Sequence, residues 1–365
     1  MKKYVLFVFC LLFSLAFLNA QTMEELHQEV KELRNQVSSL RHEFNGIDKA
    51  VDDLMWYNKL GEMAYIDKVY LTGPPKGKKK GQRKATSNND LNETNPLRIT
   101  TYIFIPRSVD PDKKYPLLVL PHGGVHGNFN TFYTHIVREL VAQEYIVVAP
   151  EYRGSTGYGR GFYEAIDYGG LEIQDVKASR DYMVENYDIV DADAIGILGW
   201  SHGGLLTLMN IFDYPDSYQV AYAGVPVSDL LARMGYKTQR YRDLYSVDYH
   251  IGETAFENLA EYRRRSPAWQ AHKLQNTPLL IHTNTNDDDV NVLEVEHLIN
   301  NLKAHNKKFE YEIYQDIPGG HIFDRIDTKF AKEVRLKVYR FLAGQLNPPK
   351  PFQGLKDLQR AGYGF

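Results

Sequence analysis

The chain has 365 residues, of which 43% are hydrophobic, 13% aromatic and 24% charged. This is a globular composition, long enough for one large domain with an appendage or for two domains. The formal net charge of −3 shows no bias toward nucleic acid or an anionic membrane. We therefore expect no nucleic-acid partner.

Residues 1–20 have the pattern of a secretory signal. Lys2 and Lys3 precede an apolar stretch that ends in Asn19-Ala20, which is the order of a charged region, an apolar region and a small-residue cleavage site. The stretch is short for a transmembrane helix of roughly 20 residues, although an uncleaved anchor is the alternative. We expect cleavage after Ala20, a secreted or periplasmic protein, and no membrane association after cleavage.

The single cysteine, Cys10, lies inside this signal. The mature protein would then have no disulfide, no thiolate metal site and no cysteine nucleophile. Any nucleophile must be another residue type.

Residues 21–60 are predicted to form a helix with a heptad seam. Val falls mostly at position a and Leu mostly at position d, which favours a parallel two-stranded coiled coil. Self-association through residues 26–54 is one interpretation, and an amphipathic helix folded back on the main domain is the other. The seam consists of Leu26, Val30, Leu33, Val37, Leu40, Phe44, Ile47, Val51 and Leu54.

The rest of the chain alternates strands and helices. A strand over 65–73 is followed by a basic tract over 76–84, which we interpret as a solvated loop rather than a polyanion-binding site. From residue 97, apolar runs alternate with helices near 130–143, 170–186, from 203, 291–304 and 328–345. This order predicts an α/β fold over 61–348, with a mostly parallel sheet covered by helices on both faces. Residues 349–365 look like an irregular tail.

The sequence Gly199-Trp200-Ser201-His202-Gly203 contains the G-x-S-x-G pattern of a nucleophile elbow. An apolar strand precedes it and a helix follows. A sharp turn from strand to helix leaves no room for side chains at the flanking positions, so glycines are needed there. The helix start directs backbone N–H groups toward the reacting oxygen. We expect Ser201 to be a nucleophile.

A serine nucleophile needs a base and an acid that orients the base. In α/β-hydrolases the acid and then the histidine follow the serine in the chain. His321 lies in a glycine-containing loop before the last helix, where this fold places its base. The acid is expected in the loop that follows the preceding strand, which carries Asp287, Asp288 and Asp289, and the rival is Asp316.

At these residues the sequence resembles the catalytic domain of the prolyl oligopeptidase family of serine peptidases, over about residues 97–346. The resemblance implies an α/β-hydrolase fold, an acyl-enzyme mechanism and no cofactor. The motifs that carry it are "YPLLVLPHGGVHG", "EYRGSTGYGRGF", "GWSHGG", "YRRRSPAW", "HTNTNDDDV" and "GGHIF".

Carried over onto this chain, the resemblance implies a triad of Ser201, Asp287 and His321. The valine spacing of the acid motif selects Asp287, with Asp288 as the alternative because the loop is one residue longer than the family pattern. The same resemblance implies further oxyanion and substrate-binding positions. These are the backbone N–H of His202, the loop of His122, Gly123 and Gly124, and Tyr152 in the second motif.

Three further departures from the family pattern are Val125, Thr283 and Glu151, the last of which replaces a common asparagine. None removes a catalytic atom. Members of the family usually also carry a β-propeller, and residues 21–97 are too few for one, so we expect a propeller-less form.

A peptidase is the favoured function, and a carboxylesterase acting on small or carbohydrate-linked esters is the alternative. A non-catalytic binding protein on the same fold is a third interpretation. The aspartate cluster also suggests a metal-dependent hydrolase as a further interpretation. We nevertheless expect no metal site, since a divalent cation needs oxygen ligands from more than one segment.

Overall fold

The structure is a computed structural model that describes residues 2–75 and 96–362, with side chains described from residue 22 onward. The basic tract over 76–84 lies outside these residues. The described strands form one eight-stranded sheet in the order β1-β2-β4-β3-β5-β6-β7-β8. The strands are β1 (Ala64–Pro75), β2 (Pro96–Pro106), β3 (Tyr115–Val119), β4 (Ile146–Glu151), β5 (Val190–Trp200), β6 (Val220–Gly224), β7 (Leu279–Asn284) and β8 (Glu310–Tyr314).

Parallel pairing runs from β4 through β3, β5, β6 and β7 to β8, whereas β1 and β2 are antiparallel to their neighbours. This is the mostly parallel sheet of an α/β-hydrolase, so the predicted fold class is confirmed. The helices are α1 (Lys2–Leu60), α2 (Thr134–Val141), α3 (Arg160–Tyr163), α4 (Glu172–Asn186), α5 (His202–Asp213), α6 (Leu230–Tyr236), α7 (Gln239–Ser246), α8 (Leu259–Arg264), α9 (Pro267–Gln270), α10 (Val292–Ala304), α11 (Lys329–Leu346) and α12 (Leu355–Gly362), with short 3₁₀ turns η2 (Thr131–Tyr133), η3 (Ala271–Lys273) and η4 (Gly320–Ile322).

The sheet separates two hydrophobic cores. Helices α4, α5 and α10 pack on one face, and α2, α11, α12 and the end of α1 pack on the other. The position of β3 between the two cores explains why its sequence is apolar without interruption. Leu117 and Val119 belong to the first core, and Leu118 belongs to the second. A strand buried on both faces needs no polar alternation.

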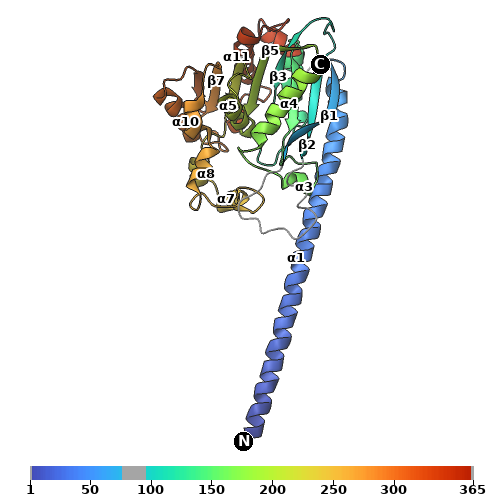
Figure 1. The fold of residues 1–365 in the computed structure, drawn as a ribbon, viewed down its shortest axis with the longest axis vertical. Coiled ribbons are helices and arrows are strands. Elements are labelled where there is room, and N and C mark those ends of the chain that lie inside the picture. The colour runs from blue at the N-terminus through green and yellow to red at the C-terminus, as the bar shows by residue number, and fades with distance from the viewer. Residues whose placement is uncertain (1, 76–95, 363–365) are drawn as a thin grey trace.

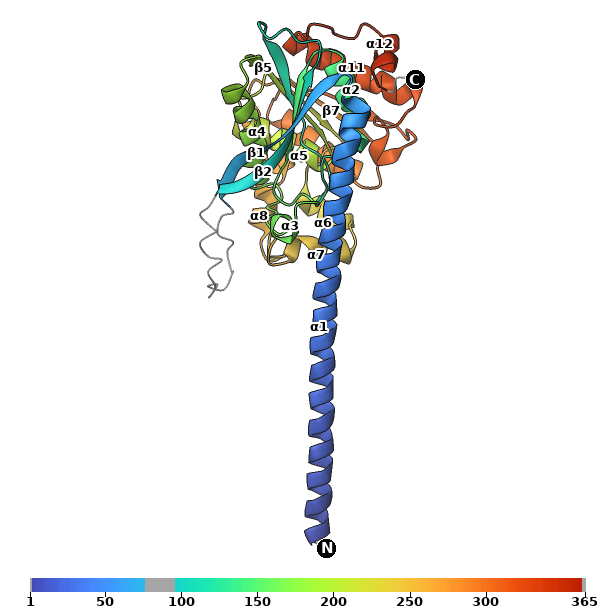
Figure 2. The same ribbon diagram turned by 90° about the vertical axis from the view of Figure 1, so that its right-hand side faces the viewer.

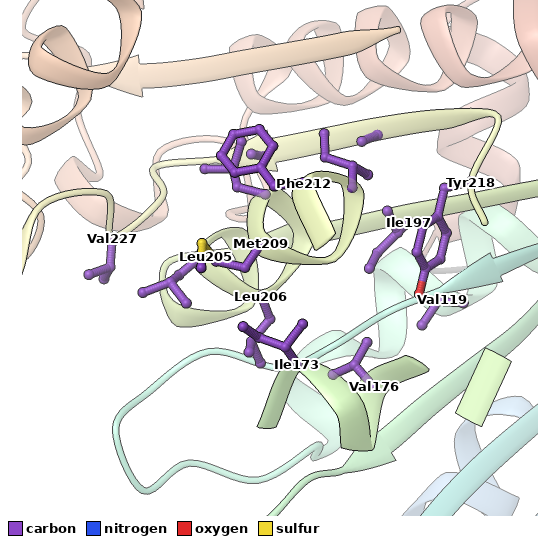
Figure 3. Close-up of a cluster of buried hydrophobic side chains, with 14 of the residues drawn as sticks. Val119, Ile173, Val176, Ile197, Leu205, Leu206, Met209, Phe212, Tyr218 and Val227 are labelled. Atoms are coloured by element: carbon purple, nitrogen blue, oxygen red, sulfur yellow. The ribbon is translucent and has the colours of Figure 1, made fainter. Parts of the chain in front are cut away.

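Helix α5, which directly follows the nucleophile candidate, lies deep in the first core. Figure 3 shows Leu205, Leu206 and Met209 of this helix close to Ile173 and Val176 of α4. All five side chains are buried. The start of α5 is therefore held firmly against its neighbours.

Two parts of the chain differ from the sequence-based expectation. The tail over 349–365, expected to be irregular, contains helix α12, because Leu358 and Ala361 are buried in the second core. The short helices α6 to α9 between β6 and β7 were not expected either. They are too short to show a helical period, and Asp229, Thr238 and Asn258 cap three of them.

Helix α1 leaves the hydrolase domain as one long rod (Figures 1 and 2). All nine side chains of the heptad seam, from Leu26 to Leu54, are exposed. From His42 onward another face of α1 packs on the domain: the His42 ring lies 5.0 Å from that of Tyr163. Trp56 and Leu60 are fully buried, and Trp56 stacks on Phe129 with centroids 5.3 Å apart. The fold-back interpretation therefore holds for the end of α1 and not for the seam. Cleavage after Ala20 stays a prediction.

Lys49 connects α1 to the interior of the domain. Its Nζ lies 2.9 Å from Glu151 Oε1 at the end of β4, and both side chains are buried. Lys49 also donates to the carbonyl oxygen of Phe129. Burial alone would raise the pKa of Glu151, but Lys49 and His122 outweigh it and hold that pKa at about 2. The ionised carboxylate thus depends on a cation supplied by α1.

We predict that Lys49→Met lowers the free energy of unfolding by about 3–5 kcal/mol, because it leaves the Glu151 charge buried without its partner. Urea unfolding followed by circular dichroism measures this change. The matched control is Lys31→Met, at an exposed position of the same helix, where we expect a change within about 0.5 kcal/mol. Equal effects of the two substitutions on the free energy of unfolding would contradict the role of Lys49 as the partner of the buried Glu151 charge.

Candidate active site

Ser201 lies at the sharp turn between β5 and α5, with φ 59° and ψ −121°. A non-glycine residue in this region is strained. The flanking glycines are required by contact distances: a Cβ on Gly203 would lie 2.3 Å from the carbonyl oxygen of Pro121, and one on Gly199 would lie 2.4 Å from that of Gly203. Close packing at the turn thus requires glycine at both flanking positions, as expected from the sequence.

His321 in η4 and Asp287 after β7 are brought together. His321 Nδ1 lies 2.7 Å from Asp287 Oδ2. The other oxygen, Oδ1, accepts the backbone N–H groups of Asp289 and Val290 at 2.9 and 2.8 Å. Asp287 is therefore held at both oxygens and oriented toward the imidazole.

The two alternative acids lie elsewhere. Asp288 is exposed, and Asp316 bonds to the hydroxyl of Thr285 at 3.1 Å. Among the hydrogen bonds of the described residues, none joins His321 to the Ser201 hydroxyl. Long contacts of this kind are common in enzymes without bound substrate and do not exclude a catalytic pair.

Asn284 at the end of β7 fastens the loop of His321 to the loop of Asp287. Its side-chain amide donates to the carbonyl oxygens of Ile317 at 2.8 Å and Gly320 at 3.3 Å. On the other side of η4, Asp324 accepts from the indole N–H of Trp200 at 2.6 Å. The histidine loop is thus tied both to the acid loop and to the residue that precedes Ser201.

Asp289, the third aspartate of the acid loop, contributes a second carboxylate near the histidine. Its Oδ2 lies 3.6 Å from His321 Nε2. Burial opposes ionisation of Asp289, but Arg233, Lys237 and His321 together lower its pKa. Arg233 of α6 also lies 3.0 Å from Glu294 of α10. These ion pairs hold the acid loop against the α6–α9 segment.

His202 is the first residue of α5, so its backbone N–H has no acceptor within the helix. This is the free donor expected beside the nucleophile. Its ring points away into the core, where Nε2 lies 2.7 Å from Glu172 Oε2 and the ring stacks on Tyr168 with centroids 3.9 Å apart. Only the backbone of His202 is therefore a candidate for contact with substrate.

The side chains of His122 and Tyr152 build the loop after β3. His122 Nε2 lies 2.8 Å from Ser155 Oγ, and its Nδ1 lies 3.0 Å from the carbonyl oxygen of Gly123. The Tyr152 hydroxyl donates to the carbonyl oxygen of His122 at 2.7 Å. Both side chains are buried, so they hold the loop in shape and neither offers a free donor. The loop itself turns at Gly124, where φ is +89°.

The Gly123 N–H, expected to face the oxyanion, donates instead to the hydroxyl of Tyr133 at 3.0 Å. Sequence reasoning missed Tyr133, and it also missed Lys49, Glu172 and Arg233. Each contacts the site from outside its motifs, and no local pattern marks it.

No group of three His, Cys, Asp or Glu side chains within the described residues is placed to hold a metal ion. In the same part of the chain, no helix is long and apolar enough to cross a membrane.

Comparison with known proteins gives matches to peptidases. Mouse dipeptidyl peptidase 8 is 31% identical over 226 residues, which cover 58% of this chain and 24% of the relative. The uncharacterized peptidase YuxL of Bacillus subtilis is 29% identical over 214 residues, covering 58% of this chain and 32% of the relative. The chain thus spans about a quarter to a third of the length of these curated relatives.

Two solved structures share the fold. A puromycin-hydrolyzing peptidase of Mycobacterium tuberculosis gives a TM-score of 0.62 at 21% identity, covering 78% of this chain and 39% of that one. A putative dipeptidyl aminopeptidase IV of Bacteroides ovatus gives a TM-score of 0.60 at 21% identity, covering 78% and 36%. Residues 130–348 match the prolyl oligopeptidase family. This chain therefore belongs to the prolyl oligopeptidase family.

Proposed function

We propose that the protein is an exported serine hydrolase that cleaves peptide bonds through an acyl-enzyme. The observation that carries the proposal is the pairing of His321 Nδ1 with Asp287 Oδ2 at 2.7 Å, in a loop tied to the strained turn at Ser201. Nucleophile, base and acid have the chain order of α/β-hydrolases. The names of the relatives favour a peptidase.

In this mechanism Ser201 Oγ attacks the substrate carbonyl carbon while its proton passes to His321 Nε2. The carbonyl π electrons move to the oxygen, and the His202 N–H stabilises the resulting oxyanion. Collapse of the intermediate breaks the bond to the leaving group, which takes the proton from His321. Water then attacks the acyl carbon while His321 takes its proton. Collapse of this second intermediate breaks the bond to Ser201 Oγ, which takes the proton back from His321. Asp287 stays ionised and holds the imidazole in the required tautomer.

A carboxylesterase acting on small or carbohydrate-linked esters is the alternative, because the same residues perform both reactions. A side-by-side assay of proline- and alanine-linked peptide substrates against short-chain and aromatic esters separates the two. A higher kcat/KM on peptides supports the peptidase, and hydrolysis of esters alone would replace it with the esterase.

We predict that a fluorophosphonate probe labels the wild-type protein and does not label Ser201→Ala. The reason is that the probe reacts only with a serine whose proton can be removed. Gel fluorescence of the labelled protein measures this, with Ser246→Ala, at a partly exposed serine of α7, as the matched control. A folded wild type that does not label would favour the non-catalytic binding protein.

The choice of acid can be tested by steady-state hydrolysis of the substrate that the wild type cleaves best in the side-by-side assay. We expect Asp287→Asn to lower kcat by about 10⁴, as loss of the triad acid does in serine proteases. Asp288→Asn, at an exposed neighbouring position, should leave kcat within a few fold. The register of the acid loop would be wrong if Asp288→Asn alone abolished turnover.

We also propose that α1 pairs with α1 of a second copy through the heptad seam. A row of nine exposed apolar side chains is a large apolar surface for a single helix in water, and its spacing fits a two-stranded coil.

Leu33→Glu combined with Val37→Glu should convert a dimer into a monomer, because it places charges at a d and an a position. Size-exclusion chromatography with light scattering gives the mass. The control is Gln36→Glu with Ser39→Glu, at exposed positions outside the seam, which should keep the dimer. A wild type with the mass of one chain would rule out the pairing.

A further inference from the structure

Glu151, the buried carboxylate at the end of β4, joins α1 to the loops around the nucleophile. Lys49 Nζ lies 2.9 Å from Glu151 Oε1 and also donates to the carbonyl oxygen of Phe129. The backbone N–H of Phe129 donates to the carboxylate at 3.1 Å, and the Tyr158 hydroxyl donates to Oε1 at 3.1 Å. One lysine of α1 therefore holds, through one carboxylate, segments that precede and follow β4 in the chain.

The same carboxylate is connected to the nucleophile through the loop after β3. Its Oε2 lies 3.3 Å from His122 Nε2, and the other ring nitrogen, Nδ1, lies 3.0 Å from the carbonyl oxygen of Gly123. Gly123 packs directly against the elbow: a Cβ built on it would lie 3.2 Å from the carbonyl oxygen of Trp200 and 3.5 Å from Ser201 Cβ. A displacement of the carboxylate is therefore passed through His122 to the backbone beside Ser201.

Further contacts from α1 support this loop from its other side. Asp52 Oδ1 accepts the backbone N–H and the hydroxyl of Thr131 at 3.0 and 2.6 Å, at the start of η2. Trp56 stacks on Phe129 with planes 5° apart. The 3₁₀ turn η2 ends at Tyr133, whose hydroxyl accepts a backbone N–H of the loop after β3. The docked end of α1 thus holds both supports of the loop that borders the nucleophile.

An ion pair is not needed merely to dock α1 on the domain. Taking two charges out of water costs free energy, and apolar residues of similar volume often replace a buried ion pair without loss of stability. The pair instead imposes a defined geometry, because the ammonium group meets the Glu151 carboxylate and the Phe129 carbonyl together. The stem of Lys49 is confined as well, since a Cβ on Gly157 would lie 2.7 Å from Lys49 Cβ.

We propose that Lys49 is a positioning residue for hydrolysis, which acts through Glu151 to hold the loop of residues 122–124 against Ser201. Turnover then depends on the docked end of α1, which lies outside the residues 130–348 that match the family. This inference rests on the proposed function, because the loop matters to the reaction only if Ser201 is the nucleophile. Lys49 itself takes no part in bond formation or proton transfer.

The test measures kcat and KM of variants of the full chain on the substrate that the wild type cleaves best. Urea unfolding followed by circular dichroism gives the folded fraction of each variant, and every rate is expressed per folded molecule. Leu302→Ala is the control for lost stability. It removes a fully buried side chain near the end of α10 and leaves the contacts of α1 intact.

We expect Lys49→Met to lower kcat per folded molecule by about 10², as a small misplacement of the groups around a reacting centre does. KM should stay within about threefold, since the loss falls on the transition state. Lys49→Arg keeps the charge and should recover most of the lost kcat, and Leu302→Ala should keep the wild-type kcat. A lysine that only stabilised the fold would leave kcat per folded molecule unchanged in Lys49→Met, and that result would overturn the proposal.

A double-substitution cycle tests the route through Glu151. Glu151→Gln, alone and combined with Lys49→Met, should lower kcat about as much as Lys49→Met does, because each variant breaks the same connection. The combined variant removes both charges of the pair, so it tests the proposal even where Lys49→Met does not fold. Wild-type kcat in the combined variant, or a loss equal to the product of the two single losses, would rule out the route.

Ser201→Ala distinguishes failure of this inference from failure of the proposed function. If Ser201→Ala abolishes hydrolysis while Lys49→Met keeps the wild-type kcat, only the positioning role is wrong. If Ser201→Ala hydrolyses the substrate as the wild type does, the serine mechanism and the role of Lys49 both fail.

Discussion

The turn at Ser201 is the constraint on which the site depends. A positive φ at a non-glycine residue persists only where the surroundings impose it. Here the Ser201 N–H bonds to the carbonyl oxygen of Gly224 at 3.0 Å, and its own carbonyl accepts from Val227 at 3.1 Å. Gly203 meets the Pro121 carbonyl so closely that no side chain fits between them. The elbow is therefore held in fixed contact with the end of β6 and with the loop after β3.

A second constraint comes from outside the region that matches the family. Glu151 at the end of β4 is a buried carboxylate, and its charge needs a cation. Lys49 of α1 provides it, and Glu151 also accepts the backbone N–H of Phe129, whose ring stacks on Tyr133. The same carboxylate lies 3.3 Å from His122 Nε2. The end of α1 thus supports the loop of His122, Gly123 and Gly124 through Glu151. The heptad seam of the same helix stays exposed.

The sequence predicted the parts of the structure that are governed by local patterns. Apolar runs and helical periods gave the sheet and its main helices, and G-x-S-x-G placed Ser201 between β5 and α5, because these signals depend on neighbouring residues. Short helices such as α8 escaped prediction since they are held by packing and capping. Tyr133, Lys49 and Arg233 escaped because no local pattern marks their contacts with Gly123, Glu151 and Asp289. Side-chain direction could not be predicted either: no local pattern indicates that the ring of His122 is buried in the domain.

In the proposed mechanism Ser201 carries the acyl group during turnover. Trapping this acyl-enzyme is the direct test of the mechanism. The protein would be mixed with p-nitrophenyl acetate, quenched in acid within the first turnover, digested and mapped by mass spectrometry. We expect an acetyl group on the peptide that contains Ser201. Steady hydrolysis without acetylated Ser201, or with the acetyl group on another residue whose substitution stops turnover, would contradict it.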